Sequence, residues 1–241
     1  MKNFLKKIIR LIQTPFILLD YLRFTKNDDE RFALRLQEAY PCLKDKTIKT
    51  GFDRHYVYHT AWAARVLFET KPVKHIDIAS SLYFAGIASA FTPIDFYDYR
   101  PADISLSNLT SNAGDLMNLP FEDASVPSIS SMHVVEHIGL GRYGDSIDPA
   151  GDIKAANELT RVLSKGGQLL FVVPIGGTAK IEYNAHRIYT YDAVLNLFPT
   201  LKLKEFSFIP EHGTGGGLQR NADPALLSNE NYACGCFLFT K

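Results

Sequence analysis

The chain has 241 residues, which suits one domain with an appendage, and 46% of them are hydrophobic, which is ample for a core. Lysine plus arginine and aspartate plus glutamate number 26 each, so the formal net charge is zero, and a nucleic-acid-binding protein is not expected. The cysteines are odd in number (Cys42, Cys234 and Cys236) and include no C-x-x-C pair. This pattern favours the reducing cytoplasm and gives no reason to expect a metal site.

The first 24 residues, MKNFLKKIIRLIQTPFILLDYLRF, form a short basic amphipathic pattern. Their longest uncharged run, residues 11–19, is too short to span a bilayer, which needs about 20 apolar residues. Three alternatives stay open for residues 1–24. They are a helix packed on the domain, a helix in peripheral contact with the inner face of a membrane, and a partner-binding helix or signal.

Strand and helix patterns alternate through the rest of the chain. A helix is expected at residues 51–69, where Trp62, Val66 and Leu67 have helical spacing, and residues 52–58 could close over a ligand. Strands are expected at 75–81, 93–100, 128–138, 168–174, 203–209 and 234–240, and helices at 153–163 and 190–198. Asp152 is the expected N-cap of the helix at 153–163, and Gly166-Gly167 its end. The pattern predicts an α/β domain at residues 71–241, preceded by a helical extension at residues 1–70.

The stretch HVVEH, residues 133–137, matches the inverted zinc-protease signature H-x-x-E-H. That signature requires a helix, whereas the adjacent valines and the preceding SISSM favour a strand. In a strand the two histidines would lie roughly 13 Å apart, too far to share one zinc ion. The carboxyl end of a parallel strand, where open α/β sheets bind ligands, is the preferred interpretation.

Two nucleotide-binding fingerprints are missing from the sequence. It contains neither GxxxxGK[ST] nor a G-x-G-x-x-G that opens a helix after the first strand. The GTGGG run at residues 213–217 comes before the last strand and is either a flexible loop or a loop that covers a ligand.

A third set of motifs fits the whole pattern. It comprises DIASS (77–81), FYDYRP (96–101), GDLMNLPFEDAS (114–125), EHI (136–138), ELTRVLSKGGQLLFVVP (158–174) and AHRIYTYDAV (185–194). In this order the motifs resemble the class I S-adenosylmethionine-dependent methyltransferases, in particular the type 11-like group related to sugar, lipid and quinone methylases. The resemblance covers about residues 72–240. More narrowly, SSLYF, DYRP, HVVEHIGLGRYGD and NAHRIY resemble a little-characterised bacterial and nematode family of unknown function.

The resemblance implies a Rossmann-like, doubly wound, mostly parallel seven-stranded sheet with helices on both faces. It implies that S-adenosylmethionine binds at the strand ends, with Asp98 on the ribose hydroxyls and Asp115 facing the adenine. The glycines of the family's D-x-G-x-G-x-G turn are replaced, with Ala79 and Ser81 in their places, and the Ser80 and Ser81 hydroxyls could hold the methionine carboxylate. The full set of cofactor candidates is Asp77, Ala79, Ser80, Ser81, Asp98, Tyr99, Asp115, Leu116 and His133.

Candidate catalytic and acceptor-binding residues lie at the end of the expected strand at 128–138, in the loop after it, and after the expected strand at 168–174. A hydroxyl acceptor needs a base with a pKa near neutral, which suits His137, with Glu136 and His186 as further catalytic candidates. The loop GLGRYGD and the segment NAHRIY supply candidates for the acceptor pocket: Arg142, Tyr143, Asp145 and Arg187. Arg187 could instead pair with an acidic residue inside the fold.

Three functions therefore remain open. The first is a methyltransferase for a small-molecule or glycan-like acceptor, with O-methylation favoured. The second is a non-catalytic binding or scaffold module with the same fold, which the altered glycine turn would favour. The third and least favoured is a metal-dependent hydrolase. The pattern leaves the acceptor and the oligomeric state undetermined.

Overall fold

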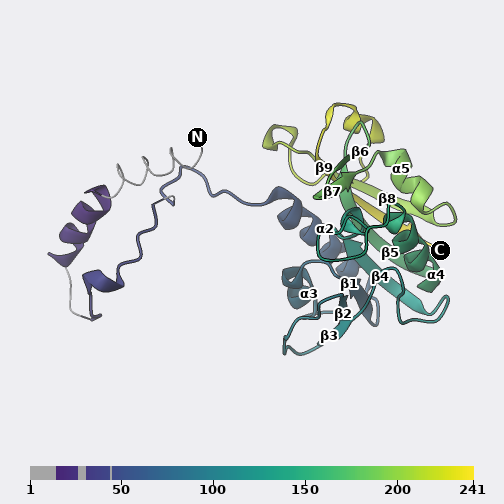
Figure 1. Ribbon diagram of the computed structural model, residues 1–241, viewed down its shortest axis with the longest axis horizontal. Coiled ribbons are helices and arrows are strands. Elements are labelled where there is room, and N and C mark those ends of the chain that lie inside the picture. The colour runs from purple at the N-terminus through teal and green to yellow at the C-terminus, as the bar shows by residue number, and fades with distance from the viewer. Residues whose placement is uncertain (1–14, 27–30, 44) are drawn as a thin grey trace. The chain divides into compact units, whose positions relative to one another are not determined.

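The computed structural model describes residues 15–26, 31–43 and 45–241, and these fall into two compact units, Met1–Phe52 and Asp53–Lys241 (Figure 1). In the first unit residues 15–25 are helical and Leu36–Glu38 (η1) forms a single 3-10 turn. None of the described residues of this unit is buried. The basic amphipathic pattern falls largely on residues 1–14, which lie outside the described residues. No helix in the described part of the chain is long and apolar enough to cross a membrane.

The second unit is built on a seven-stranded sheet in the order β3-β2-β1-β4-β5-β9-β8. Strands β1 to β5 pair in parallel, whereas β9 runs antiparallel to both β5 and β8. The strands are β1 (His75–Ile78), β2 (Ile94–Asp98), β3 (Leu109–Ala113), β4 (Val126–Met132), β5 (Leu163–Ile175), β8 (Lys202–Ile209) and β9 (Ala233–Thr240). A separate hairpin joins β6 (Lys180–Glu182) to β7 (His186–Ile188). This confirms the mostly parallel α/β sheet that the sequence predicts.

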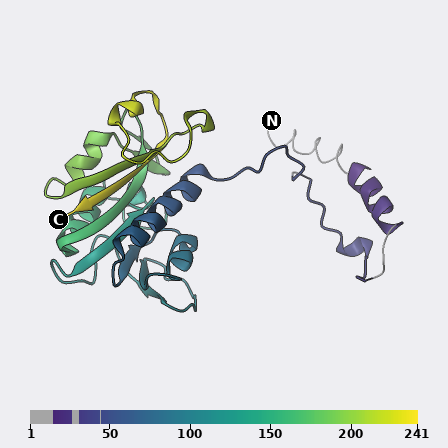
Figure 2. The ribbon, with the colours of Figure 1, turned by 180° about the vertical axis from the view of Figure 1, so that it is seen from behind.

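Helices cover both faces of the sheet (Figures 1 and 2). The helices are α2 (Arg54–Thr70), α3 (Leu82–Ala88), α4 (Gly151–Val162) and α5 (Tyr191–Leu197), with 3-10 turns η2 (Val135–His137), η3 (Gly213–Gly215) and η4 (Pro224–Asn229). Strand β5 shows the two-sided burial directly, because its side chains alternate between two cores. Leu170 and Val172 pack with α2 and α3, whereas Leu169 and Phe171 pack with α4 and α5.

The second unit begins at Asp53, so α2 belongs to it, whereas the sequence analysis places the boundary after residue 70. The physical reason is the buried face of α2, where Trp62, Val66 and Leu67 have exposed fractions of 1% or less. Asp53 starts the helix by accepting a hydrogen bond from the Tyr56 amide, at 3.1 Å.

Two predicted strand ends and both predicted ends of one helix are wrong. The strand at 128–138 ends at Met132, because His133 adopts a left-handed conformation (φ 58°) and Val135–His137 forms a 3-10 turn. The strand at 75–81 ends at Ile78, because Ala79 is also left-handed, with φ 53°. Helix α4 has Ala150 rather than Asp152 at its N-cap and continues directly into β5, so Gly166-Gly167 lies inside that strand.

Candidate functional site

A cavity of about 300 Å³ opens at the carboxyl ends of β1, β2 and β4. This is the edge at which open α/β sheets bind ligands. The site candidates that line it are Ala79, Asp98, Tyr99, Asp115, Leu116, His133, His137, Tyr143 and Asp145. The candidates outside its lining are Asp77, Ser80, Ser81, Glu136, Arg142, His186 and Arg187.

Two carboxylates form the acidic wall of the cavity. Asp98 ends β2 and Asp115 follows β3, and these neighbouring parallel strands bring their ends together. One oxygen of each carboxylate holds its own loop: Asp98 Oδ1 accepts from the Arg100 amide and Asp115 Oδ1 from the Met117 amide, both at 2.8 Å. Neither Oδ2 makes a hydrogen bond within the described chain, so each can accept hydrogen bonds from a ligand.

The turn after β1 keeps a left-handed backbone without a glycine. Ala79 has φ 53°, a region that costs a residue with a Cβ roughly 1–2 kcal/mol. Its amide donates to the Tyr97 carbonyl at 2.7 Å, which fixes the turn beside β2. The Ser80 hydroxyl accepts from the Met132 amide at 3.1 Å, and Ser81 makes no side-chain capping bond to α3. The Ser80 hydroxyl is thus used inside the protein rather than in the cavity.

Asp77 lies behind this turn, in a fully buried polar chain that joins β1 to β4. His75 contacts the Ser128 hydroxyl at 2.7 Å and the Ser130 hydroxyl at 2.9 Å, and Ser130 donates to Asp77 Oδ1. Burial lowers the pKa of His75 to about 3 and raises that of Asp77 to about 7. Asp77 therefore holds the two strands together and does not reach the cavity.

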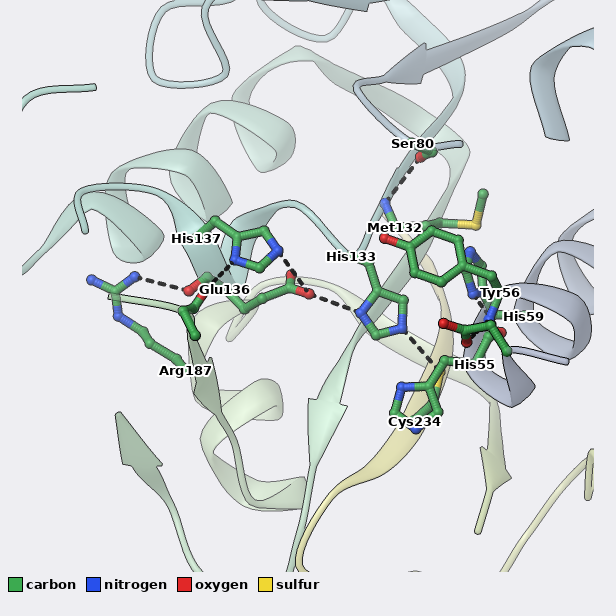
Figure 3. Close-up of polar contacts among 12 residues, drawn as sticks. His55, Tyr56, His59, Ser80, Met132, His133, Glu136, His137, Arg187 and Cys234 are labelled. Carbon is green, nitrogen blue, oxygen red and sulfur yellow. Dashed lines mark hydrogen bonds and ion pairs between the residues drawn. The ribbon is translucent and has the colours of Figure 1, made fainter. Parts of the chain in front are cut away.

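The opposite wall is built from histidines that share one buried carboxylate (Figure 3). His133 Nδ1 lies 2.8 Å from Glu136 Oε1, and His137 Nε2 lies 3.7 Å from the same oxygen. The turn after Met132 makes this possible and overturns the prediction that a strand continues through HVVEH. Burial opposes the charged form of His133, but its contacts with Cys234 and Glu136 prevail and raise its pKa to about 10.

His137 faces the cavity as a neutral imidazole. The Ala185 carbonyl accepts from His137 Nδ1 at 2.6 Å and from Arg142 at 2.8 Å. Burial lowers the pKa of His137, so the ring is neutral at pH 7. With the proton on Nδ1, the Nε2 lone pair remains available to accept another.

The loop after η2 forms the rim. Asp145 accepts from the Gly139 amide at 2.8 Å and from the Tyr143 amide at 3.2 Å, and these bonds lower its pKa although burial opposes them. The Tyr143 ring lies 5.1 Å from the guanidinium groups of both Arg100 and Arg142. The rim is therefore cationic and aromatic, and the hydrogen bonds to Asp145 hold its loop in place.

Two further candidates lie outside the cavity lining and contact other parts of the fold. Arg187 is 5% exposed, donates to the Ile138 carbonyl at 2.7 Å and lies 3.6 Å from Asp152. This is the alternative in which Arg187 pairs with an acidic residue inside the fold. His186 Nε2 lies 3.4 Å from Glu182, and its ring centroid is 6.3 Å from that of His137.

Sequence reasoning missed part of the site. Arg100 lines the cavity beside Asp98, and its place in the DYRP motif was the available signal. Tyr56 lines it too, within the segment at 52–58 that was expected to close over a ligand. Nothing in the sequence pattern shows that His55 and Cys234 meet His133.

Three solved structures have a similar fold. A candidate sarcosine dimethylglycine methyltransferase from Galdieria sulphuraria is 18% identical, with a TM-score of 0.53, covering 76% of this chain and 84% of its own. A possible histamine N-methyltransferase from Thermotoga maritima, described as S-adenosylmethionine-dependent, is 14% identical, with a TM-score of 0.52, covering 78% and 90%. A candidate methyltransferase from Bacillus halodurans is 15% identical, with a TM-score of 0.51, covering 74% and 98%.

Sequence comparison adds a family of unknown function. Residues 96–206 match the family model described as Caenorhabditis protein of unknown function, DUF268. No curated protein matches the sequence. The narrower resemblance predicted from the motifs agrees with this match. The chain has the Rossmann-like fold of the class I S-adenosylmethionine-dependent methyltransferases, and that predicted resemblance is confirmed.

Proposed function

We propose that this chain is an S-adenosylmethionine-dependent methyltransferase that methylates a hydroxyl group of a small-molecule or glycan-like acceptor. One observation carries the proposal. In a methyltransferase fold, the cavity at the carboxyl edge of the sheet has the Asp98 and Asp115 carboxylates on one wall and the neutral His137 on the other.

The residues present fit the cofactor. A volume of about 300 Å³ is at the lower end of the range for small-molecule sites. Asp98 Oδ2 can accept from a ribose diol, and Asp115 with the buried Leu116 provides a polar edge and an apolar wall for an adenine. When bound, S-adenosylmethionine supplies an electrophilic methyl group.

Proton transfer and positioning of the acceptor would depend on other residues of the cavity and its rim. His137 Nε2 would accept the proton of the acceptor hydroxyl, because the Ala185 carbonyl fixes the tautomer that leaves this nitrogen unprotonated. Glu136, 3.7 Å away, would stabilise the imidazolium that results. Tyr143 and Arg100 at the rim would position a polar acceptor, since alignment of donor and acceptor is the main demand of a direct displacement.

A second function has its own supporting observation. Ala79 occupies a left-handed position that glycine adopts without strain, and the Ser80 hydroxyl bonds within the protein. Both features suit a protein that has lost tight cofactor binding and serves as a binding or scaffold module. HVVEH gives the hydrolase no such support, because His133 and His137 do not lie on one α-helix as the zinc-protease signature requires.

We place the protein in the cytoplasm and propose that residues 1–24 contact the inner face of a membrane. The described helix at 15–25 supports this, because Phe16, Leu19 and Leu22 are each about half or more exposed. Deletion of residues 1–24 should abolish co-sedimentation with anionic lipid vesicles, and unchanged co-sedimentation would contradict the proposal.

Methyl transfer is tested with isotopically labelled S-adenosylmethionine and a panel of hydroxylated small molecules and glycans. Mass spectrometry should find a labelled methyl group on an acceptor hydroxyl with the wild-type chain, and much less of it with Asp98→Ala at cofactor concentrations below saturation. Cofactor binding without transfer to any hydroxyl acceptor would contradict O-methylation and favour the binding module.

A further inference from the structure

Three metal-ligating side chains meet beside the cavity, although the sequence suggests no metal site. His55 on α2, His133 after β4 and Cys234 on β9 are all buried, and one nitrogen or sulfur atom of each lies within 4.8 Å of the others. Figure 3 shows His133 between Glu136 and Cys234, with His55 beside Cys234. This grouping is not the zinc-protease set, which would have paired His133 with His137.

The closest contact in the cluster has the spacing of two zinc ligands. His133 Nε2 lies 3.5 Å from Cys234 Sγ. Zn–N bonds of about 2.0–2.1 Å and Zn–S bonds of about 2.3 Å at a tetrahedral angle put nitrogen and sulfur roughly 3.5 Å apart. The pair therefore needs no rearrangement to share an ion, and His55 needs only a small approach.

The outer partners of both histidines also match a metal site. Histidine ligands usually donate their second N–H to a carboxylate or a carbonyl, which orients the ring. His133 Nδ1 meets Glu136 Oε1 at 2.8 Å, and His55 is hydrogen-bonded to the backbone of Tyr232.

Two buried polar atoms of neighbouring residues lack a hydrogen-bond partner within the described chain. They are Glu136 Oε2 and His59 Nε2, and the His59 ring centroid lies 5.0 Å from that of His133. Leaving such atoms unpaired costs about 1–3 kcal/mol each. A thiol–imidazole hydrogen bond would explain the His133–Cys234 contact, but not the third metal-ligating side chain, His55 on α2.

We propose that His55, His133 and Cys234 bind a divalent transition-metal ion of the zinc type. Imidazole and thiolate ligands select ions of this class. Three protein ligands are one fewer than structural zinc sites have, so the fourth position is left to water. His133 also lines the cavity, which places the ion at the border of the candidate site. This inference is independent of methyl transfer.

The test is a cobalt titration of the metal-stripped full-length chain, followed by displacement with zinc. We expect one Co²⁺ per chain, with visible d–d absorption typical of tetrahedral cobalt and a near-ultraviolet sulfur-to-cobalt charge-transfer band. Zn²⁺ should abolish both signals. Folded wild-type chain that binds no stoichiometric cobalt or zinc at millimolar concentrations would overturn the proposal.

Matched variants assign the ligands. Cys234→Ala should lose the charge-transfer band, whereas Cys236→Ala, an equally buried cysteine on the same strand, should keep it. Glu136→Gln should weaken binding about 10–100-fold, as expected for a partner of a metal-bound histidine. If Cys234→Ala does not fold, His55→Gln on α2 provides the second assignment, through loss of the tetrahedral d–d signal. A band retained in Cys234→Ala, or an unchanged signal in His55→Gln, would contradict the assignment.

Discussion

The two walls of the cavity differ in the solvent exposure and the hydrogen bonding of their charged side chains. On the acidic wall, Asp98 and Asp115 are accessible, and each uses one oxygen to hold its own loop. On the opposite wall, His133 and His137 share Glu136, which is 1% exposed. An accessible carboxylate with a spare oxygen suits ligand binding, whereas a buried and coupled set suits proton handling or metal binding. We therefore expect variants of the acidic wall to change cofactor affinity and variants of the histidine wall to change the rate of methyl transfer.

The largest effect is expected from His137→Gln. Loss of a general base should lower the rate of methyl transfer about 100–10,000-fold and leave cofactor affinity unchanged. His186→Gln is the matched control, because His186 lies outside the cavity lining and should change the rate little. Burial lowers the pKa of His137 from 6.5, so the wild-type rate should fall only below pH 6.5. Equal losses in the two variants would contradict the assignment of the base.

Asp77→Asn should change the pH dependence of stability. Burial raises the pKa of Asp77 from 3.8 to about 7, so between these values the unfolded chain releases a proton that the folded chain retains. Its contribution to stability is therefore fully present below about pH 4 and is lost as pH rises through 7, by at most about 4 kcal/mol.

Denaturant unfolding of both chains between pH 4 and 8 measures this effect. The wild type should lose stability relative to Asp77→Asn as pH rises. Parallel curves for the two chains would show that the Asp77 pKa is not raised. Because Asp77 lies behind the acidic wall, cofactor affinity should hardly change in Asp77→Asn.

Asp98→Ala should weaken cofactor binding about 10–100-fold, the value of hydrogen bonds to a charged group. The control is Asp95→Ala on the same strand, where the carboxylate pairs with Lys74 at the surface and does not line the cavity. Calorimetric titration with S-adenosylhomocysteine distinguishes the two variants. If both bind as tightly as the wild type, Asp98 does not hold the cofactor.

Ala79→Gly should have the smallest effect, a gain in stability of about 1 kcal/mol from relief of the left-handed backbone. Ala124→Gly is the matched control, because Ala124 has φ 54° in an exposed turn outside the cavity lining. Both variants should unfold at higher denaturant concentration, but only Ala79→Gly should bind the cofactor more tightly. A gain in affinity for both, or for neither, would remove the turn from the binding site.

The acidic wall was predictable because it follows the order of the chain. The strand pattern put Asp98 at a strand end, and the register of the motifs that resemble the methyltransferases added Asp115. In the structure the carboxyl ends of these neighbouring parallel strands meet at one edge. Alignment with the D-x-G-x-G-x-G motif likewise placed Ala79 in the turn after the first strand. The burial of Asp77 was not foreseen, because it depends on the polar chain through Ser130 of β4.

The histidine wall was not predictable in the same way. The sequence pattern predicted that the strand continues through HVVEH. In the structure the chain turns at His133, and this turn brings both histidines to Glu136. His55 and Cys234 lie far from His133 in the sequence, and only the packing of α2 and β9 brings them together. The internal partners of Arg187 were likewise open until the fold was known.

Calorimetric titration of the wild-type chain with S-adenosylmethionine and S-adenosylhomocysteine tests the central claim most directly. We predict micromolar binding of both, one molecule per chain, which would mean that the turn at Ala79 still supports cofactor binding. A folded chain that binds neither ligand at millimolar concentrations would contradict the proposed methyltransferase and leave the binding module as the function of this fold.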